Sequence, residues 1–150
     1  PSISLICEAV QGRAIAGEDR LGTSVNYVIV GAMTPRHALD HFRPRSVLVT
    51  PGDREDMILA ALSKHSVLSS AEDLTSGIIL TGGLMPHKTI VDLIKKADLP
   101  TVMTSLGTYE VASAIHDLVA KIRAEDSDKI ATAERLVEEN VDLGKILSMS

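Results

Sequence analysis

At 150 residues, the chain is long enough for one domain with a sizeable hydrophobic core. It has no Trp, one Phe, two Tyr and a formal net charge of −5, which counts against single-stranded nucleic-acid binding through stacked bases and against binding to phosphate backbones. Its one cysteine excludes an internal disulfide and a zinc site built from cysteines, and predicts a reducing, cytoplasmic environment, while no apolar run approaches the roughly 20 residues of a membrane span.

The first 50 residues are predicted to form strands and one short helix. Apolar runs rich in β-branched residues predict strands at residues 3–10, 27–30 and 47–49, and a short strand can also form at 13–16. Thr34 followed by Pro35 is typical of a helix start, because Thr caps free N–H groups and Pro suits the first helical position. The helix is expected to end near Phe42.

From residue 51 onward, helices and strands alternate. Apolar residues predict helices that begin after Gly52, at Met85 and at Gly107, the last running to Ile122, and strands at 78–80 and 101–104. This alternation indicates parallel strands joined by right-handed crossovers. The predicted fold class is therefore α/β, a three-layer sandwich with a mostly parallel central sheet. The opening strands have no helix between them, so the sheet can be mixed.

Residues 125–150 differ in composition from the rest of the chain. They contain seven acidic and three basic residues, so a balance of −4 out of the net −5 lies here. Ile130, Ala133, Val137 and Val141 recur at helical spacing and give the segment one apolar face. We therefore expect an α/β domain at 1–124, followed at 125–150 by an extra acidic helix or linker that packs on its own domain or on a neighbour.

The charged sequence after Gly52 is the first candidate site. Asp53 suits a helix N-cap, and the acids that follow it suit the first turn, because carboxylates there meet unpaired N–H groups and the positive end of the helix dipole. Arg54 works against that dipole and needs a carboxylate, a phosphate or another partner. Structural pairing and ligand contact are equally compatible with Arg54.

Thr81-Gly82-Gly83, directly after a predicted strand, is the second candidate. Glycines at a strand-to-helix turn let the backbone approach an anion closely, and the next helix N-terminus favours negative charge. An ordinary glycine turn explains the same residues and is the favoured interpretation. Neither a P-loop nor a dinucleotide-binding fingerprint occurs in the sequence.

Catalytic groups do not assemble in the sequence. The five histidines are scattered, and His37 and His41 share helical spacing without a third metal ligand, which favours solvated or capping roles. Cys7 lies in an apolar run and is interpreted as buried rather than reactive. We therefore expect no catalytic residue, no metal and no cofactor.

Asp53-Arg54 and Thr81-Gly82-Gly83, separated by a helix and a strand, resemble the two signatures from which the DRTGG domain takes its name. The flanking sequence is also similar, and residues 121–142 resemble the linker that follows this domain in long bacterial phosphotransacetylases. The resemblance covers most of the chain from about Gly12. It implies a fold like the N-terminal domain of HPr kinase, and a regulatory or ligand-sensing module found beside CBS, P-loop or acetyltransferase domains. Pro1 in place of Met fits a domain cut from a longer protein.

Residues and resemblance together favour a non-enzymatic regulatory module that binds a small anionic ligand or a partner domain at the carboxyl edge of the sheet. The expected ligand-binding residues are Asp53, Arg54, Thr81, Gly82 and Gly83. Arg54 would hold negative charge, Thr81 would supply a hydroxyl, and the two glycines would let the backbone approach. The alternative is a structural module in which the same segments form a homodimer or interdomain interface. An independent enzyme is least favoured, because no base, nucleophile or metal cluster can be assembled.

Overall fold

A five-stranded mixed sheet forms the centre of the computed structural model, which describes residues 1–67 and 75–149, with side chains at 1–65 and 75–138. The strands are β1 (Arg13–Ala16), β2 (Tyr27–Val30), β3 (Ser46–Pro51), β4 (Gly77–Thr81) and β5 (Thr101–Met103). Their order is β1-β5-β4-β3-β2, in which β2 to β5 are parallel and β1 pairs antiparallel with β5. The strands at 13–16 and 27–30, and the mostly parallel sheet, are confirmed.

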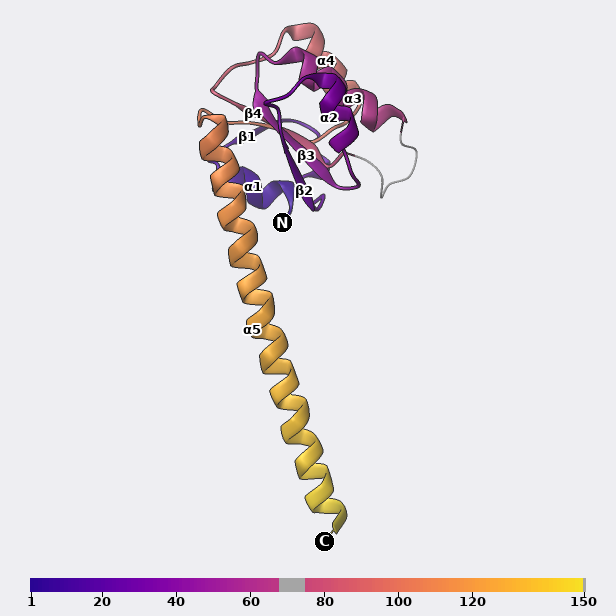
Figure 1. The fold of residues 1–150 in the computed structure, drawn as a ribbon, viewed down its shortest axis with the longest axis vertical. Coiled ribbons are helices and arrows are strands. Elements are labelled where there is room, and N and C mark those ends of the chain that lie inside the picture. Colours follow the sequence, from indigo (N-terminus) through magenta and orange to yellow (C-terminus); the bar gives the residue numbers. More distant parts are fainter. Residues whose placement is uncertain (68–74, 150) are drawn as a thin grey trace. The chain divides into compact units, whose positions relative to one another are not determined.

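Helices cover both faces of this sheet (Figure 1). The α-helices are α1 (Ile3–Ala9), α2 (Pro35–His41), α3 (Glu55–Val67), α4 (Lys88–Lys96) and α5 (Thr108–Met149), and a 3₁₀ turn, η1, spans Glu18–Arg20. Ala38 of α2, Met57 and Ala61 of α3 and Ile94 of α4 pack with Leu48 in one buried cluster. On the opposite face, α1 and the start of α5 bury their own aliphatic side chains, which completes the predicted three-layer sandwich.

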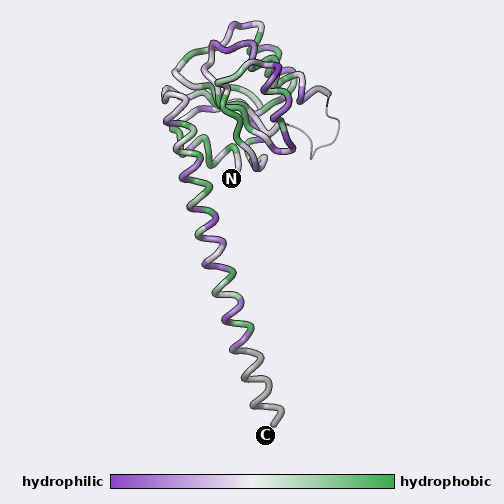
Figure 2. Tube along the Cα trace, in the orientation of Figure 1, coloured by the Kyte–Doolittle hydropathy of each residue, from purple (hydrophilic) through white to green (hydrophobic). Residues whose placement is uncertain are grey.

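Hydrophobic residues are concentrated in the central strands of the sheet (Figure 2). Every residue of β4 is buried. β3 is likewise buried along all but its last residue. Parallel strands covered on both faces need such continuous apolar runs, so the pattern seen in the sequence and the observed sheet agree. Within the described residues, no helix has both the length and the apolar composition that a bilayer crossing needs.

The prediction of a strand at residues 3–10 is wrong, because this segment forms α1. Ser2 caps the helix by accepting a hydrogen bond from the Leu5 N–H at 3.2 Å. Ile3, Ile6 and Val10 are fully buried, whereas Leu5 is 43% exposed. The buried side chains therefore follow helical spacing rather than the alternation of a strand.

Two helix boundaries also differ from the prediction. α4 begins at Lys88 rather than at Met85, because the His87 side chain accepts a hydrogen bond from the Thr89 N–H at 3.1 Å and caps the helix. α5 runs from Thr108 to Met149 without the expected break between Ile122 and residue 125, where good helix formers fill the gap. The chain divides into two compact units, Pro1–His116 and Asp117–Ser150, so the boundary is within this helix.

Candidate functional site

The two candidate segments are neighbours at the carboxyl ends of β3 and β4. Pro51, at the end of β3, pairs with Thr81, at the end of β4, and the Gly52 N–H donates a hydrogen bond to the Thr81 carbonyl at 3.3 Å. A Cβ atom on Gly52 would lie 1.6 Å from the Leu84 carbonyl oxygen, so the backbones of the two turns are in direct contact. Segments that are far apart in the sequence thus meet at one edge of the sheet.

Arg54 lies directly before α3 and holds the connection between β2 and α2. Its Nη1 donates to the Gly31 carbonyl at 2.9 Å, and its Nη2 donates to the Met33 carbonyl at 3.1 Å. The Arg54 carbonyl accepts hydrogen bonds from the N–H groups of Met57 and Ile58, so Arg54 occupies the cap position expected for Asp53. Asp53 is one residue further out and is exposed.

Asp56 occupies the remaining edge of the Arg54 guanidinium. Nε donates to Asp56 Oδ1 at 3.0 Å and Nη2 donates to Asp56 Oδ2 at 3.2 Å, a forked arrangement typical of strong Arg–carboxylate pairs. The hydrogen bond to Arg54 holds the pKa of Asp56 below its ordinary value, and the same bond raises the pKa of Arg54. Both side chains remain accessible, with 34% of Arg54 and 50% of Asp56 exposed.

The Thr81-Gly82-Gly83 turn uses its polar groups within the domain. The Gly82 N–H donates to the Leu106 carbonyl at 2.8 Å, and the Gly83 N–H donates to the Thr104 carbonyl at 2.9 Å. Both glycines have positive φ, 77° and 67°, a conformation that other residues adopt at a cost. The Thr81 hydroxyl lies 2.8 Å from the Thr108 hydroxyl at the start of α5. The hydrogen bonds of the turn therefore hold the end of β4 against the segment that leads into α5.

The five predicted residues thus share one edge of the sheet, but their side chains contact different segments. Arg54 contacts the connection after β2, Thr81 contacts Thr108, and Asp53 is exposed to solvent. The N–H groups of both glycines already have carbonyl partners. A role for these residues in ligand binding stays a prediction, and the observed hydrogen bonds give the two motifs a role in turn geometry.

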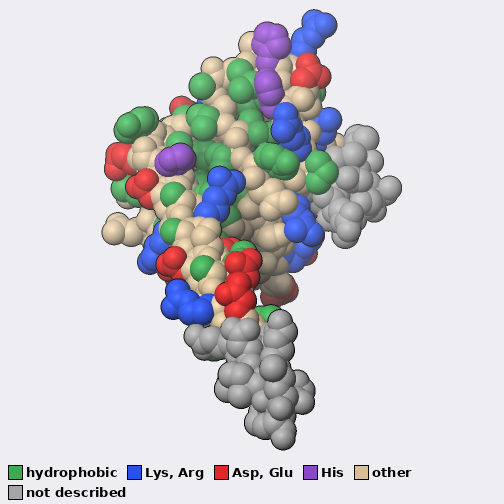
Figure 3. Space-filling view, turned by 60° about the horizontal axis from the view of Figure 1, so that its bottom comes forward, with side chains coloured by type: hydrophobic (Ala, Val, Ile, Leu, Met, Phe, Trp, Pro, Cys, Tyr) green, Lys and Arg blue, Asp and Glu red, His purple; other side chains and the backbone are tan. Residues whose placement is uncertain are grey.

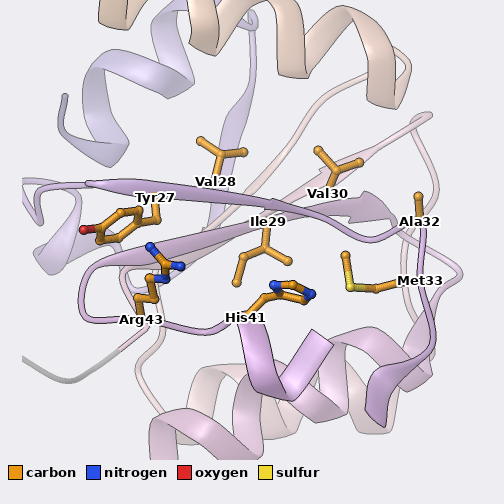
Figure 4. A pocket seen from close by; sticks show the side chains of 8 residues that line it. All are labelled: Tyr27, Val28, Ile29, Val30, Ala32, Met33, His41 and Arg43. Atoms are coloured by element: carbon orange, nitrogen blue, oxygen red, sulfur yellow. The ribbon is translucent and has the colours of Figure 1, made fainter. Parts of the chain in front are cut away.

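A hollow of about 390 Å³ lies along β2 and was not anticipated from the sequence (Figure 4). One side of it is lined by the side chains of Tyr27, Ile29, Met33, His41 and Arg43. The side chains of Val28 and Val30 point to the opposite side of the strand. The Arg43 guanidinium lies 5.3 Å from the centroid of the Tyr27 ring, within range of a cation–π interaction. The hollow combines an aromatic surface with positive charge.

Arg54 connects this hollow to the motif edge. The hollow is bounded at one end by Ala32 and Met33, and the Met33 carbonyl is one of the acceptors of the Arg54 guanidinium. The hollow could not be located from the sequence, because its position depends on β2 being an edge strand, and strand order is a tertiary property. The sequence from His41 to Arg43, at the end of α2, was its only local signal.

Other titratable groups form no catalytic cluster in the described part of the chain. No group of three or more His, Cys, Asp or Glu side chains that could hold a metal ion occurs there. His87 caps α4, as the capping interpretation predicted, and the Nε2 of His65 lies 3.0 Å from the Ala97 carbonyl oxygen. Cys7 is partly buried in α1 rather than in a strand, and burial, with a smaller effect of Glu8, raises the pKa of its thiol.

Comparison with known proteins finds relatives that are similar over nearly the whole chain. The chain is 32% identical over 149 residues to a phosphate acetyltransferase of Nitratidesulfovibrio vulgaris, and this match covers 97% of the chain and 21% of that protein. It is 30% identical over 146 residues to a phosphate acetyltransferase of Synechocystis sp., covering 95% and 21% respectively. The chain therefore spans about a fifth of the length of these relatives.

A solved structure has the same fold. It is the crystal structure of the CBS and DRTGG domains of the regulatory region of Clostridium perfringens pyrophosphatase, complexed with the activator diadenosine tetraphosphate. The TM-score is 0.61 at 22% sequence identity, over 76% of this chain and 45% of that one. Residues 5–118 match the DRTGG domain. The chain therefore belongs to the DRTGG domain family, as its two sequence motifs indicated.

Proposed function

We propose that this chain is a non-enzymatic regulatory module that senses a small anionic ligand within a longer, phosphate acetyltransferase-like protein. Its family occurs in a regulatory region whose structure holds a nucleotide activator, and its relatives are about five times its length. The partners expected in such a protein are an acetyltransferase, P-loop or CBS domain. The DRTGG domain would bind the ligand and pass its presence on to that partner domain.

The forked pair of Arg54 and Asp56 is the observation that carries this proposal. Two main-chain carbonyls fix the guanidinium, and its remaining edge is paired with the carboxylate of Asp56, whose side chain is 50% exposed. A phosphate or carboxylate group of a ligand can make the same two parallel hydrogen bonds. Asp56 is therefore an internal competitor that an anionic ligand displaces from Arg54.

Displacing Asp56 has a structural consequence at the hollow. Arg54 holds the Gly31 and Met33 carbonyls with the same guanidinium that would bind the ligand. A ligand that draws the guanidinium toward solvent loosens these two hydrogen bonds, and one that binds in line with Asp56 preserves them. Only the first of these effects changes the order of the segment that bounds the hollow along β2. In this way one cation couples ligand binding to a surface available to a partner.

Isothermal titration calorimetry against diadenosine tetraphosphate, adenine nucleotides, acetyl phosphate, coenzyme A and organic acids tests the proposal. We expect binding by the wild-type chain, severalfold tighter binding by Asp56→Asn, and loss of binding by Arg54→Ala. Asp92→Asn, an acid-to-amide change on α4, is the matched control and should bind as the wild type does. Binding that is identical in all four proteins would overturn the role of Arg54, and no binding of any ligand would overturn sensing.

A second candidate is a structural module that forms an interface at the motif edge. The hydrogen bonds of Gly82 and Gly83 within the domain favour it, as do Leu84 and Met85, which follow the turn and are 44% and 49% exposed. Exposed apolar residues beside a fixed turn suit a contact with another domain or copy. Sedimentation velocity of Met85→Asp and of the wild type separates the two candidates, because a ligand site predicts no change in mass.

A further inference from the structure

The described part of α5 beyond His116 carries an apolar stripe that no segment of its own unit covers. Ile130 and Val137 are 60% and 61% exposed, Ala133 lies between them, and Leu136 beside them is 55% exposed. Acidic, basic and single apolar side chains are interspersed along this part of the helix (Figure 3). Spacings of three and four residues place Ile130, Ala133 and Val137 on one face.

Small Ala133 makes this face suitable for another helix. One shallow groove runs between Ile130, Ala133 and Val137 beside Glu134, and a second runs past Lys129, Ala133 and Leu136. Ala133 lines both grooves, so it is the low point between them. A low point flanked by larger side chains at i−3 and i+4 accepts a side chain from a facing helix, as in coiled-coil packing.

The charges beside the stripe are complementary to those of a second copy of the same helix. With Ile130 at heptad position a, Ala133 falls at d and Val137 at the next a. Lys129 then occupies position g and Glu134 position e. In a parallel, in-register pair, a g residue of one helix faces the e residue five positions later in its partner. Lys129 of each copy therefore meets Glu134 of the other, twice per pair.

We propose that residues 129–137 of α5 form a parallel, in-register helix pair between two copies of this chain, through Ile130, Ala133 and Val137 and two Lys129–Glu134 ion pairs. An antiparallel pair would set g opposite g and e opposite e, so it would not bring Lys129 to Glu134. The inference does not depend on ligand sensing, since none of these residues belongs to the motif edge.

Asp126 sets the limit of this contact. It occupies the preceding d position, where two copies would place carboxylates opposite each other, and Arg123 occupies the a position before it. Apolar contact therefore begins at Ile130 and the pair is weak when isolated. Replacing Asp126 with Leu would extend the apolar seam by one layer toward the N-terminus, so this variant is expected to associate more tightly.

Sedimentation velocity of the full 150-residue chain over a concentration series tests the proposal with a charge exchange. Lys129→Glu and Glu134→Lys each turn both ion pairs into repulsions, and we expect each to raise the dimer dissociation constant roughly tenfold. A mixture of the two variants, or both changes in one chain, restores the opposite charges and should recover wild-type association. Far-UV circular dichroism verifies that helix content is unchanged.

Disulfide trapping tests the register independently. In a Cys7→Ser background, Ala133→Cys should form an intermolecular disulfide under mild oxidation, because d positions face each other in a parallel pair. Arg135→Cys, on the outer face of the same helix, is the control and should not crosslink. A wild-type chain that stays monomeric at a few hundred micromolar would overturn the proposal, as would charge-exchanged chains that do not recover association or equal crosslinking at both positions.

Discussion

Gly52 is where the two motif segments touch, and replacing it with alanine tests whether this contact holds the carboxyl edge of the sheet together. The added Cβ atom would lie 1.6 Å from the Leu84 carbonyl oxygen and 2.5 Å from the Leu84 carbonyl carbon. Real Cβ contacts do not fall below 3.0 Å, so the Leu84 backbone must retreat by roughly 1.4 Å, the difference between 3.0 and 1.6 Å. The obstacle is backbone, which cannot rotate away as a side chain can.

The cost of this retreat follows from what surrounds it. Leu84 follows directly on Gly83, whose N–H is hydrogen-bonded to Thr104, and Gly52 itself donates to Thr81. Moving Leu84 therefore strains hydrogen bonds in both turns, each of which contributes about 1 kcal/mol to stability. Together with the overpacking itself, we expect Gly52→Ala to lower the free energy of unfolding by about 3 kcal/mol or more.

Urea titrations followed by far-UV circular dichroism measure this change against two matched variants. Gly22→Ala meets no atom within 4 Å and should unfold within about 0.5 kcal/mol of the wild type. Gly31→Ala meets the Thr50 hydroxyl at 2.7 Å and the Thr50 Cβ at 2.9 Å and should have an intermediate effect, because the hydroxyl can rotate away and the overlap with the Cβ is much smaller than the one at Gly52. If Gly52→Ala and Gly22→Ala unfold at the same urea concentration, the two turns are not held by this contact.

Three further predictions concern hydrogen bonds at the site and in the core. Arg54→Ala removes both hydrogen bonds to the connection after β2 and should lower the free energy of unfolding by about 1–2 kcal/mol. Hydrogen exchange at the amides of Ala32 and Met33 should become faster, and unchanged exchange there would contradict the role of the guanidinium. The pKa of Asp56 is lowered in the folded state, so its ion pair with Arg54 stabilises the fold above a pH of about 4, and this stabilisation is lost as the pH falls through the folded pKa. Asp56→Asn should therefore make the free energy of unfolding less dependent on pH in the acid range. The change is expected to be less than about 1 kcal/mol, because the pair is exposed. Thr104→Val removes a buried hydroxyl that donates to the Val10 carbonyl at 2.7 Å. We expect the free energy of unfolding, measured by thermal unfolding, to fall by about 1–3 kcal/mol. A change under about 0.5 kcal/mol would show that the carbonyl finds another donor.

The alternation of elements after residue 51 made most of the fold predictable. Buried parallel strands need continuous apolar runs, and Val47 to Val49 and Ile78 to Leu80 show them plainly. α1 was mistaken for a strand because its sequence is apolar at nearly every position, and the deciding spacing of Ile3, Ile6 and Val10 is visible only once burial is known. Short apolar runs do not distinguish a buried helix from a strand.

The convergence of the two motifs was predictable from the sequence, but their contacts were not. Both motifs follow strands that pair side by side, so their convergence at one edge follows from the parallel sheet. The acceptors of Arg54 are main-chain carbonyls 21 and 23 residues away, and any residue type carries such a carbonyl. For the same reason, nothing in the sequence indicated that the N–H groups of Gly82 and Gly83 are occupied.

Among the described residues, β2 is an edge strand with no strand on its outer side, which has a consequence for handling the protein. Tyr27 and Gly31 donate their N–H groups to the carbonyls of Arg45 and Val49 in β3 and the turn before it. Since alternate residues of a strand bond to the same neighbour, the main-chain groups of Val28 point outward, and its own side chain is 39% exposed. An uncovered edge of this kind is a template on which foreign strands add, and natural sheets protect it with charge. Arg43, over the Tyr27 ring, places a cation there, so neutralising Arg43 is expected to favour the addition of a foreign strand at this edge.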